Sequence, residues 1–134
     1  MSFQPRDIPA GVYTHLNFAF ASIDPVTFQV VPADQGDTAL YSKLTDLKKI
    51  DSNLKVYIAI GGWDFTEPWK NTRTTFSDLV GSETNQRAFF ASLISFMSTY
   101  NFDGVDIDWE YEHPLPPPSP LGRPPANRCI STRP

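Results

Sequence analysis

The stretch that decides the fold is Leu54-Lys55-Val56-Tyr57-Ile58-Ala59-Ile60-Gly61-Gly62. Its first seven residues are almost continuously apolar, and the run stops at two consecutive glycines. Such a run is typical of a parallel strand that is covered on both faces, because the crossovers between parallel strands place helices over the sheet. We therefore expect a buried strand over residues 54–60 and a turn at the glycine pair.

The segments on either side of this strand predict further strands. Residues 12–21 mix β-branched and aromatic residues with few charges, which favours a buried strand. Residues 104–110 are interpreted as another strand, and residues 27–31 form a shorter candidate. Residues 64–81 are interpreted as a loop with a helical turn around residues 76–80.

Two helices are predicted between these strands. Asp37 is a candidate N-cap for a helix over about 38–50, and Ser82 is one for a helix that ends near Tyr100. Apolar residues on one side of the second helix are interpreted as core packing: Phe89, Phe90, Leu93, Met97 and Tyr100. Strand–helix–strand–helix–strand order predicts parallel pairing through right-handed crossovers, and hence an α/β architecture.

Composition excludes several classes of protein. The chain has 134 residues, 40% of them hydrophobic and 13% aromatic, which is typical of a globular protein. Its net charge of −4 argues against a nucleic-acid or anionic-membrane surface, since both need basic side chains. No apolar run reaches the ~18 residues of a membrane span, and no signal peptide is recognised at the start. The single cysteine, Cys129, excludes an internal disulfide.

A change of composition near residue 113 predicts a domain boundary. Of the 13 prolines, eight lie within residues 114–134, where helix and interior strand are disfavoured. We expect an ordered domain over residues 1–113 and a disordered proline-rich tail over 114–134, with a groove-binding proline-rich ligand as the alternative. The abrupt change also suggests a truncated or misjoined reading frame.

The chemistry is concentrated in Asp103-Gly104-Val105-Asp106-Ile107-Asp108-Trp109-Glu110. Because strand side chains alternate, Asp106, Asp108 and Glu110 share one face, while Asp103 has the opposite parity and is interpreted as a structural hydrogen-bonding residue. Repulsion and desolvation within a sheet should raise the pKa of at least one of these carboxyls, so that it can act as a general acid.

Two other interpretations of the acidic cluster are less favoured. A solvated charged edge fits poorly with the apolar residues between the acids. Calcium or magnesium would suit the oxygen ligands, but the calcium-loop spacing fails, because Tyr111 stands where glycine is required and Pro117 where glutamate is required. We therefore predict no metal site.

The pattern Asp103-x-x-Asp106-x-Asp108-x-Glu110, followed by Tyr111, resembles the signature of glycoside hydrolase family 18 chitinases. Ala59-Ile60-Gly61-Gly62 followed by Trp63 is similar to the second family motif, with alanine in place of the usual serine. Thr14 to Phe20 resembles the second strand of the family. The sequence of residues 3–65 resembles that of fungal killer-toxin-like chitinases.

The resemblance implies part of a TIM (β/α)8 barrel, about strands two to four, that acts on chitin or chito-oligosaccharides without a cofactor. Glu110 would be the general acid, Asp108 would orient the 2-acetamido group of the substrate, and Asp106 would share a proton with Asp108. The positions that match sugar contacts are Gly61, Gly62, Trp63, Asp64 and Tyr111.

The resemblance also leaves alternatives open. Glu112 follows Tyr111 where the family usually has proline, and a complete barrel typically needs ~250 residues. We expect this chain to be inactive by itself, an extracellular location for the parent family, and neither an obligate protein partner nor a nucleic-acid or membrane partner. A non-catalytic chitin-binding protein and a nonfunctional truncated product remain alternatives.

Overall fold

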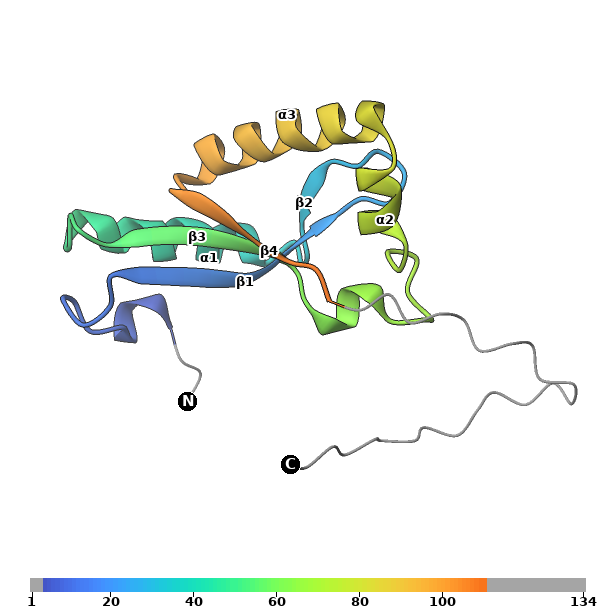
Figure 1. Cartoon of the computed structure of the whole chain (residues 1–134). Helices are drawn as coiled ribbons and strands as arrows, with labels where there is room; N and C mark the ends of the chain where they lie inside the picture. Colours follow the sequence, from blue (N-terminus) through green and yellow to red (C-terminus); the bar gives the residue numbers. More distant parts are fainter. Residues whose placement is uncertain (1–3, 111–134) are drawn as a thin grey trace, which may run out of the picture.

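The computed structural model describes residues 4–110, in which strands alternate with helices (Figure 1). The strands and helices, in chain order, are β1 (His15–Ile23), β2 (Val30–Pro32), α1 (Asp37–Thr45), β3 (Lys55–Gly61), α2 (Thr75–Val80), α3 (Glu83–Tyr100) and β4 (Gly104–Asp108). Short 3-10 turns add η1 (Pro5–Asp7), η2 (Asp46–Lys49) and η3 (Trp63–Thr66). All the strands expected from sequence are present, with shifted ends.

The four strands form one sheet in the order β2-β1-β3-β4. Strands β1, β3 and β4 run parallel, as the alternation of strands and helices predicts, and β2 pairs antiparallel with β1. The pairing of β1 with β3 is regular from His15 opposite Lys55 to Ala19 opposite Ala59, and then shifts by one residue. The carboxyl ends of the three parallel strands therefore meet at one edge of the sheet.

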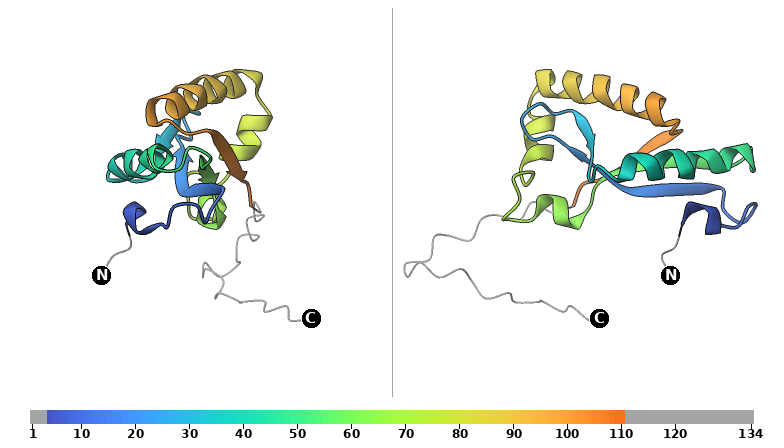
Figure 2. Two further views of the ribbon diagram at one scale, coloured as in Figure 1. Left: turned by 90° about the vertical axis from the view of Figure 1, so that its left-hand side faces the viewer. Right: turned by 180° about the vertical axis from the view of Figure 1, so that it is seen from behind.

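Helices α1 and α3 pack against one face of the sheet (Figure 2). Val56, Ile58 and Ile60 of β3 point into this layer and are fully buried, whereas Tyr57 on the other face is half-buried. The expectation that this strand is covered on both faces is therefore wrong for residues 4–110, since the helices described there lie on one side. Parallel α/β architecture with one open face fits part of a TIM barrel.

The core between α1, α3 and the sheet is strongly aromatic. The ring of Tyr41 makes edge contacts with four aromatic rings, at centroid distances of 4.7–5.5 Å, from Phe18, Phe96, Tyr100 and Phe102. Burial raises the pKa of the Tyr41 hydroxyl, and the charge of Asp37 adds to the effect. This cluster joins both helices to β1 and to the start of β4.

One residue of the predicted aromatic stripe on α3 was placed wrongly. Phe89 and Leu93 are buried as expected, but Phe90 is 56% exposed and Phe96 takes a buried position instead. An α-helix completes one turn every 3.6 residues, so positions 89, 93 and 96 share one face and position 90 is rotated away from it.

The helix starts were predicted with mixed success. Ser82 is the N-cap of α3, and its hydroxyl accepts a hydrogen bond from the amide of Asn85 at 3.4 Å. Gly36 is the N-cap of α1, so the prediction of Asp37 is wrong by one residue. The Asp37 carboxylate instead accepts a bond from the Asp34 amide at 3.1 Å, and the predicted helix over 38–50 is divided between α1 and η2.

Two further expectations concern the proline-rich tail and membrane spans. The predicted tail over 114–134 lies outside the described residues, so the division at residue 113 stays a prediction. Among residues 4–110, no helix combines the length and the apolar character that crossing a bilayer requires.

Candidate active site

The candidate site is built where β4 runs beside β3 at the carboxyl edge of the sheet. The parallel register places Asp106 beside Ala59 and Asp108 beside Gly61, so the two acids face small residues. Val105 has the opposite parity and packs against the core. Adjacent positions on one face of a strand are ~6.6–6.8 Å apart, which keeps Asp106 and Asp108 within reach of one substrate.

Asp106 is held from the other side of β3 by Asn17. The side-chain amide of Asn17 on β1 donates a hydrogen bond to Oδ2 of Asp106 at 2.7 Å, over a separation of 89 residues. The small side chain of Ala59, beside Asp106 in the register, leaves room for this contact. Sequence reasoning missed this role, although Asn17 is a polar residue within an otherwise largely apolar strand.

The acids are less buried than the sequence led us to expect. Asp106 and Glu110 are exposed and Asp108 is half-buried. The desolvation that was expected inside a covered parallel sheet is therefore lacking at these positions within residues 4–110, because the face of β4 that carries the acids is the open one. Glu110 follows the end of β4 by two residues.

The backbone conformation at positions 61 and 62 favours glycine. Their φ angles are +111° and +84°, in the region that side chains rarely adopt. A Cβ atom at position 61 would lie 2.3 Å from the carbonyl oxygen of Asp108, and the amide of Gly62 donates to this same oxygen at 2.9 Å. The glycine pair thus lets the end of β3 approach the end of β4.

The chain then enters η3, which presents two of the predicted sugar-contact residues. The side chain of Trp63 is 64% exposed, so its ring is free for stacking. Asp64 forms an ion pair with Lys70, with Oδ2 and Nζ 2.6 Å apart. Asp64, Lys70, Phe20 and Gly61 line one cleft of about 500 Å³ at this edge of the sheet. Tyr111 lies outside the described residues.

Asp103 sits at the opposite end of β4 and has a different environment. Its Oδ2 accepts hydrogen bonds from the amide of Val56 at 2.9 Å and from Nζ of Lys48 at 3.0 Å. Lys48 also donates to the carbonyl of Asn101 at 2.6 Å. Burial would raise the pKa of Asp103, but these hydrogen bonds and the charges of Lys48 and Lys55 lower it overall. The residue therefore ties the starts of β3 and β4 to the end of η2.

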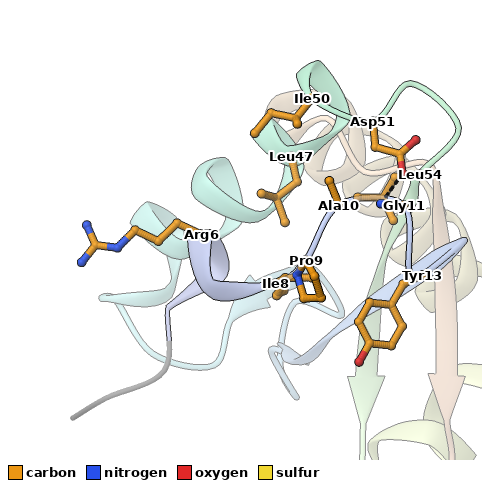
Figure 3. A pocket seen from close by; sticks show the side chains of 10 residues that line it. All are labelled: Arg6, Ile8, Pro9, Ala10, Gly11, Tyr13, Leu47, Ile50, Asp51 and Leu54. Carbon is orange, nitrogen blue, oxygen red and sulfur yellow. Dashed lines mark hydrogen bonds between the residues drawn. The ribbon is translucent and has the colours of Figure 1, made fainter.

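A second hollow, of about 110 Å³, lies at the amino ends of the strands (Figure 3). Its walls are mostly apolar, with Ile8, Leu47 and Leu54 around it, and the amide of Gly11 donates to Asp51 at 3.1 Å on its rim. In barrels of this kind the amino-terminal face serves stability, and the chemistry lies at the carboxyl ends. We therefore assign the candidate site to the acidic edge.

Within residues 4–110, no three side chains of histidine, cysteine, aspartate or glutamate are grouped so that they could hold a metal ion.

The acids lie at the carboxyl end of β4, at the edge of the sheet where the exposed Trp63 follows β3. This arrangement fits part of a (β/α) barrel, a fold class whose active sites lie at that edge. The chain belongs to glycosyl hydrolases family 18, whose model matches residues 2–119. It is 38% identical over 109 residues to chitotriosidase-1 of Mus musculus, and the aligned region covers 81% of this chain and 22% of that protein. It is also 38% identical over 112 residues to the killer toxin subunits alpha/beta of Kluyveromyces lactis, covering 83% of this chain and 9% of that protein.

Solved structures agree with this assignment. Catalytic domain 2 of a group II chitinase from Ostrinia furnacalis, solved as a mutant with bound (NAG)5, superposes with a TM-score of 0.72 at 31% identity, covering 81% of this chain and 27% of that chain. Human YKL-39, described as a pseudo-chitinase with retained chitooligosaccharide binding, superposes with a TM-score of 0.67 at 33% identity, covering 80% and 27%. The chain thus spans less than a third of the length of these relatives.

Proposed function

We propose that this chain carries the acid-bearing strands of a chitin-hydrolysing site. The observation that carries the proposal is the placement of Asp106 and Asp108 on the open face of β4, beside Ala59 and Gly61 of β3. The exposed Trp63 follows Gly61 by two residues at the same edge of the sheet. Family membership supports the same reaction class. Chitin and chito-oligosaccharides are the proposed substrates.

The proposed mechanism is substrate-assisted. Glu110 donates its proton to the glycosidic oxygen, while the carbonyl oxygen of the substrate's 2-acetamido group attacks the anomeric carbon and the glycosidic bond breaks. The ring so formed carries positive charge, which Asp108 stabilises by accepting a hydrogen bond from the acetamido N–H. Water then attacks the anomeric carbon and breaks its bond to the acetamido oxygen, which restores the acetamido group. Glu110 takes up a proton from this water, and the product keeps its original configuration.

The neighbouring residues support these roles. We infer that Asn17, by holding one oxygen of Asp106, orients this carboxylate toward Asp108, with which it shares a proton. Trp63 offers an aromatic face for a sugar ring, and Gly61, Gly62, Asp64 and Tyr111 are proposed as further sugar contacts. In this scheme the strand β4 supplies the chemistry, and the segment after β3 supplies binding.

The test uses a chimaera in which residues 4–110 replace the aligned segment of mouse chitotriosidase-1. We expect the chimaera to release the fluorophore from a chitotrioside, and Glu110→Gln to lower this turnover about 10²–10⁴-fold while oligosaccharide binding persists. Substrate whose N-acetyl groups have been removed should not react, because it lacks the internal nucleophile. Equal cleavage of acetylated and deacetylated substrate would show that the assignment of Asp108 and Glu110 is wrong.

A second function is supported by the likeness to a pseudo-chitinase that retains chitooligosaccharide binding. In that case the protein would bind chito-oligosaccharides through Trp63 and its neighbours without cleaving them. Saturable binding combined with turnover that Glu110→Gln leaves unchanged would favour this alternative. For the 134-residue chain alone we expect negligible hydrolysis, and for the parent protein an extracellular location, where polymeric chitin is accessible.

A further inference from the structure

The ion pair between Asp64 and Lys70 lies on the rim of the cleft at the carboxyl edge of the sheet. Asp64 is in η3, directly after the glycine pair, and Lys70 is in the loop that leads to α2. Oδ2 and Nζ are 2.6 Å apart, and the two side chains are 53% and 39% exposed. Both residues line the cleft, together with the carboxylate of Asp37, so the charge of each is accessible to a bound molecule. Lys70 is the one cation in this lining, within residues 4–110.

The loop that carries this pair is held by hydrogen bonds and by a buried phenylalanine. Phe65 is buried, and its carbonyl oxygen accepts a hydrogen bond from the Thr72 hydroxyl at 2.6 Å, which closes the loop. The amide of Lys70 donates to the carbonyl of Glu67 at 2.9 Å, and its own carbonyl accepts from Arg73 at 3.3 Å. These hydrogen bonds hold the backbone on both sides of the ion pair, and so they position Asp64 and Lys70 in the cleft.

We propose that Lys70 is a specificity-determining residue that neutralises Asp64 and so shifts the selectivity of the cleft toward uncharged N-acetylated chains and away from cationic deacetylated ones. The inference rests on the proposed binding of chito-oligosaccharides at this edge. A bare carboxylate at position 64 would attract the ammonium group of a glucosamine unit. With Lys70 beside it, the repulsion between the lysine and the ammonium group offsets this attraction, while a neutral N-acetyl unit experiences neither force.

The inference predicts a measurable change in selectivity. Two unit charges in water 4–6 Å apart change an affinity by a factor of about three to six. Lys70→Met should therefore raise the affinity for fully deacetylated chitotetraose by about this factor and leave the affinity for the acetylated tetramer nearly unchanged. The gain should shrink when the salt concentration rises, because exposed charges are screened.

The experiment is a nuclear magnetic resonance titration of the ¹⁵N-labelled 134-residue chain with each tetramer at about pH 5, where primary amines are charged. Lys70→Arg keeps the charge and should keep the wild-type selectivity. Lys49→Met is the matched control, because Lys49 pairs with Asp46 at 2.6 Å in η2 and does not line this cleft. It alters the net charge equally and should leave selectivity unchanged. Adding Asp64→Asn to Lys70→Met should remove the gain, which separates Asp64 from the acids of β4.

Each outcome is decisive. Unchanged selectivity in Lys70→Met, with the acetylated tetramer still bound, would overturn the inference and leave the proposed function standing. Loss of acetylated-tetramer binding in Lys70→Met, with an unchanged circular dichroism spectrum, would also overturn it, since the lysine would then contact the sugar directly. Failure of the wild-type chain to bind either tetramer would count against the proposed function and take this inference with it.

Discussion

Replacing Gly61 by alanine should destabilise the protein far more than its single added methyl group suggests. The residue has a φ angle of +111°, and the new Cβ atom would lie 2.3 Å from the carbonyl oxygen of Asp108 and 3.0 Å from the Phe76 ring. Ordinary Cβ contacts are 3.4–4 Å, so β4 would have to move away from β3. That movement would break the hydrogen bond from the Gly62 amide to Asp108.

The magnitude follows from adding these costs. A side chain held in a sparsely populated backbone region costs about 1–3 kcal/mol. The lost hydrogen bond adds about 1 kcal/mol, so Gly61→Ala should lower the free energy of unfolding by about 2–4 kcal/mol. Gly11→Ala is the matched control, because Gly11 has a φ angle of +76° and nothing within 4 Å of the added Cβ atom. It should cost only the backbone strain, about 1–3 kcal/mol, without the lost hydrogen bond.

Urea unfolding followed by circular dichroism measures both variants. Tryptophan fluorescence adds a local probe, because Trp109 stacks on Phe76 at a centroid distance of 5.5 Å and Phe76 is one of the groups that the new methyl would displace. A difference of less than about 0.5 kcal/mol between Gly61→Ala and Gly11→Ala would refute the reasoning, since the backbone strain that both variants share would then account for both.

Three further predictions concern the supports of the sheet and the site. The lowered pKa of Asp103 means that its carboxylate stabilises the fold above its unfolded pKa, and that this contribution is lost as the pH falls through the folded pKa, below about pH 4. Asp103→Asn should therefore cost about 1 kcal/mol at neutral pH and flatten the acid limb of a stability–pH profile, whereas an unchanged acid limb would contradict this. Ser82→Ala removes the N-cap of α3 and should cost about 1 kcal/mol in urea unfolding, with Ser98→Ala on the exposed face of α3 as the neutral control. In the chitotriosidase chimaera, Asn17→Ala should lower kcat about tenfold or more with little change in KM, because Asp106 loses its orienting hydrogen bond; an effect on KM alone would argue for a sugar contact instead.

The class of fold was predictable because it depends on local periodicity. The uninterrupted apolar run over residues 54–60 and the three- and four-residue spacing over 82–100 each describe how one segment buries its own side chains. The order of such segments then restricts the topology, and the parallel pairing of β1, β3 and β4 follows. The side-by-side placement of Asp106 and Asp108 needs only the two-residue period of a strand.

Errors arose where a prediction depended on what surrounds a segment. The run over 54–60 indicated cover on both faces, but the helices within residues 4–110 lie on one face, and this leaves Asp106 and Glu110 exposed. Phe90 was assigned to the core because it is aromatic, although one step along a helix rotates a side chain by ~100°. The first error concerns neighbouring elements, whereas the second concerns the position of one residue on its own helix.

By itself, the sequence determined the order of strands and helices, the parity of the acids and the family motifs, because these depend on residues that are close along the chain. Only the tertiary structure decided which distant residues meet. Asn17 reaches Asp106 across 89 residues, and the clearance at Gly61 is set by the carbonyl of Asp108 on another strand. Such contacts depend on strand register and crossover geometry, which one-dimensional spacing does not contain.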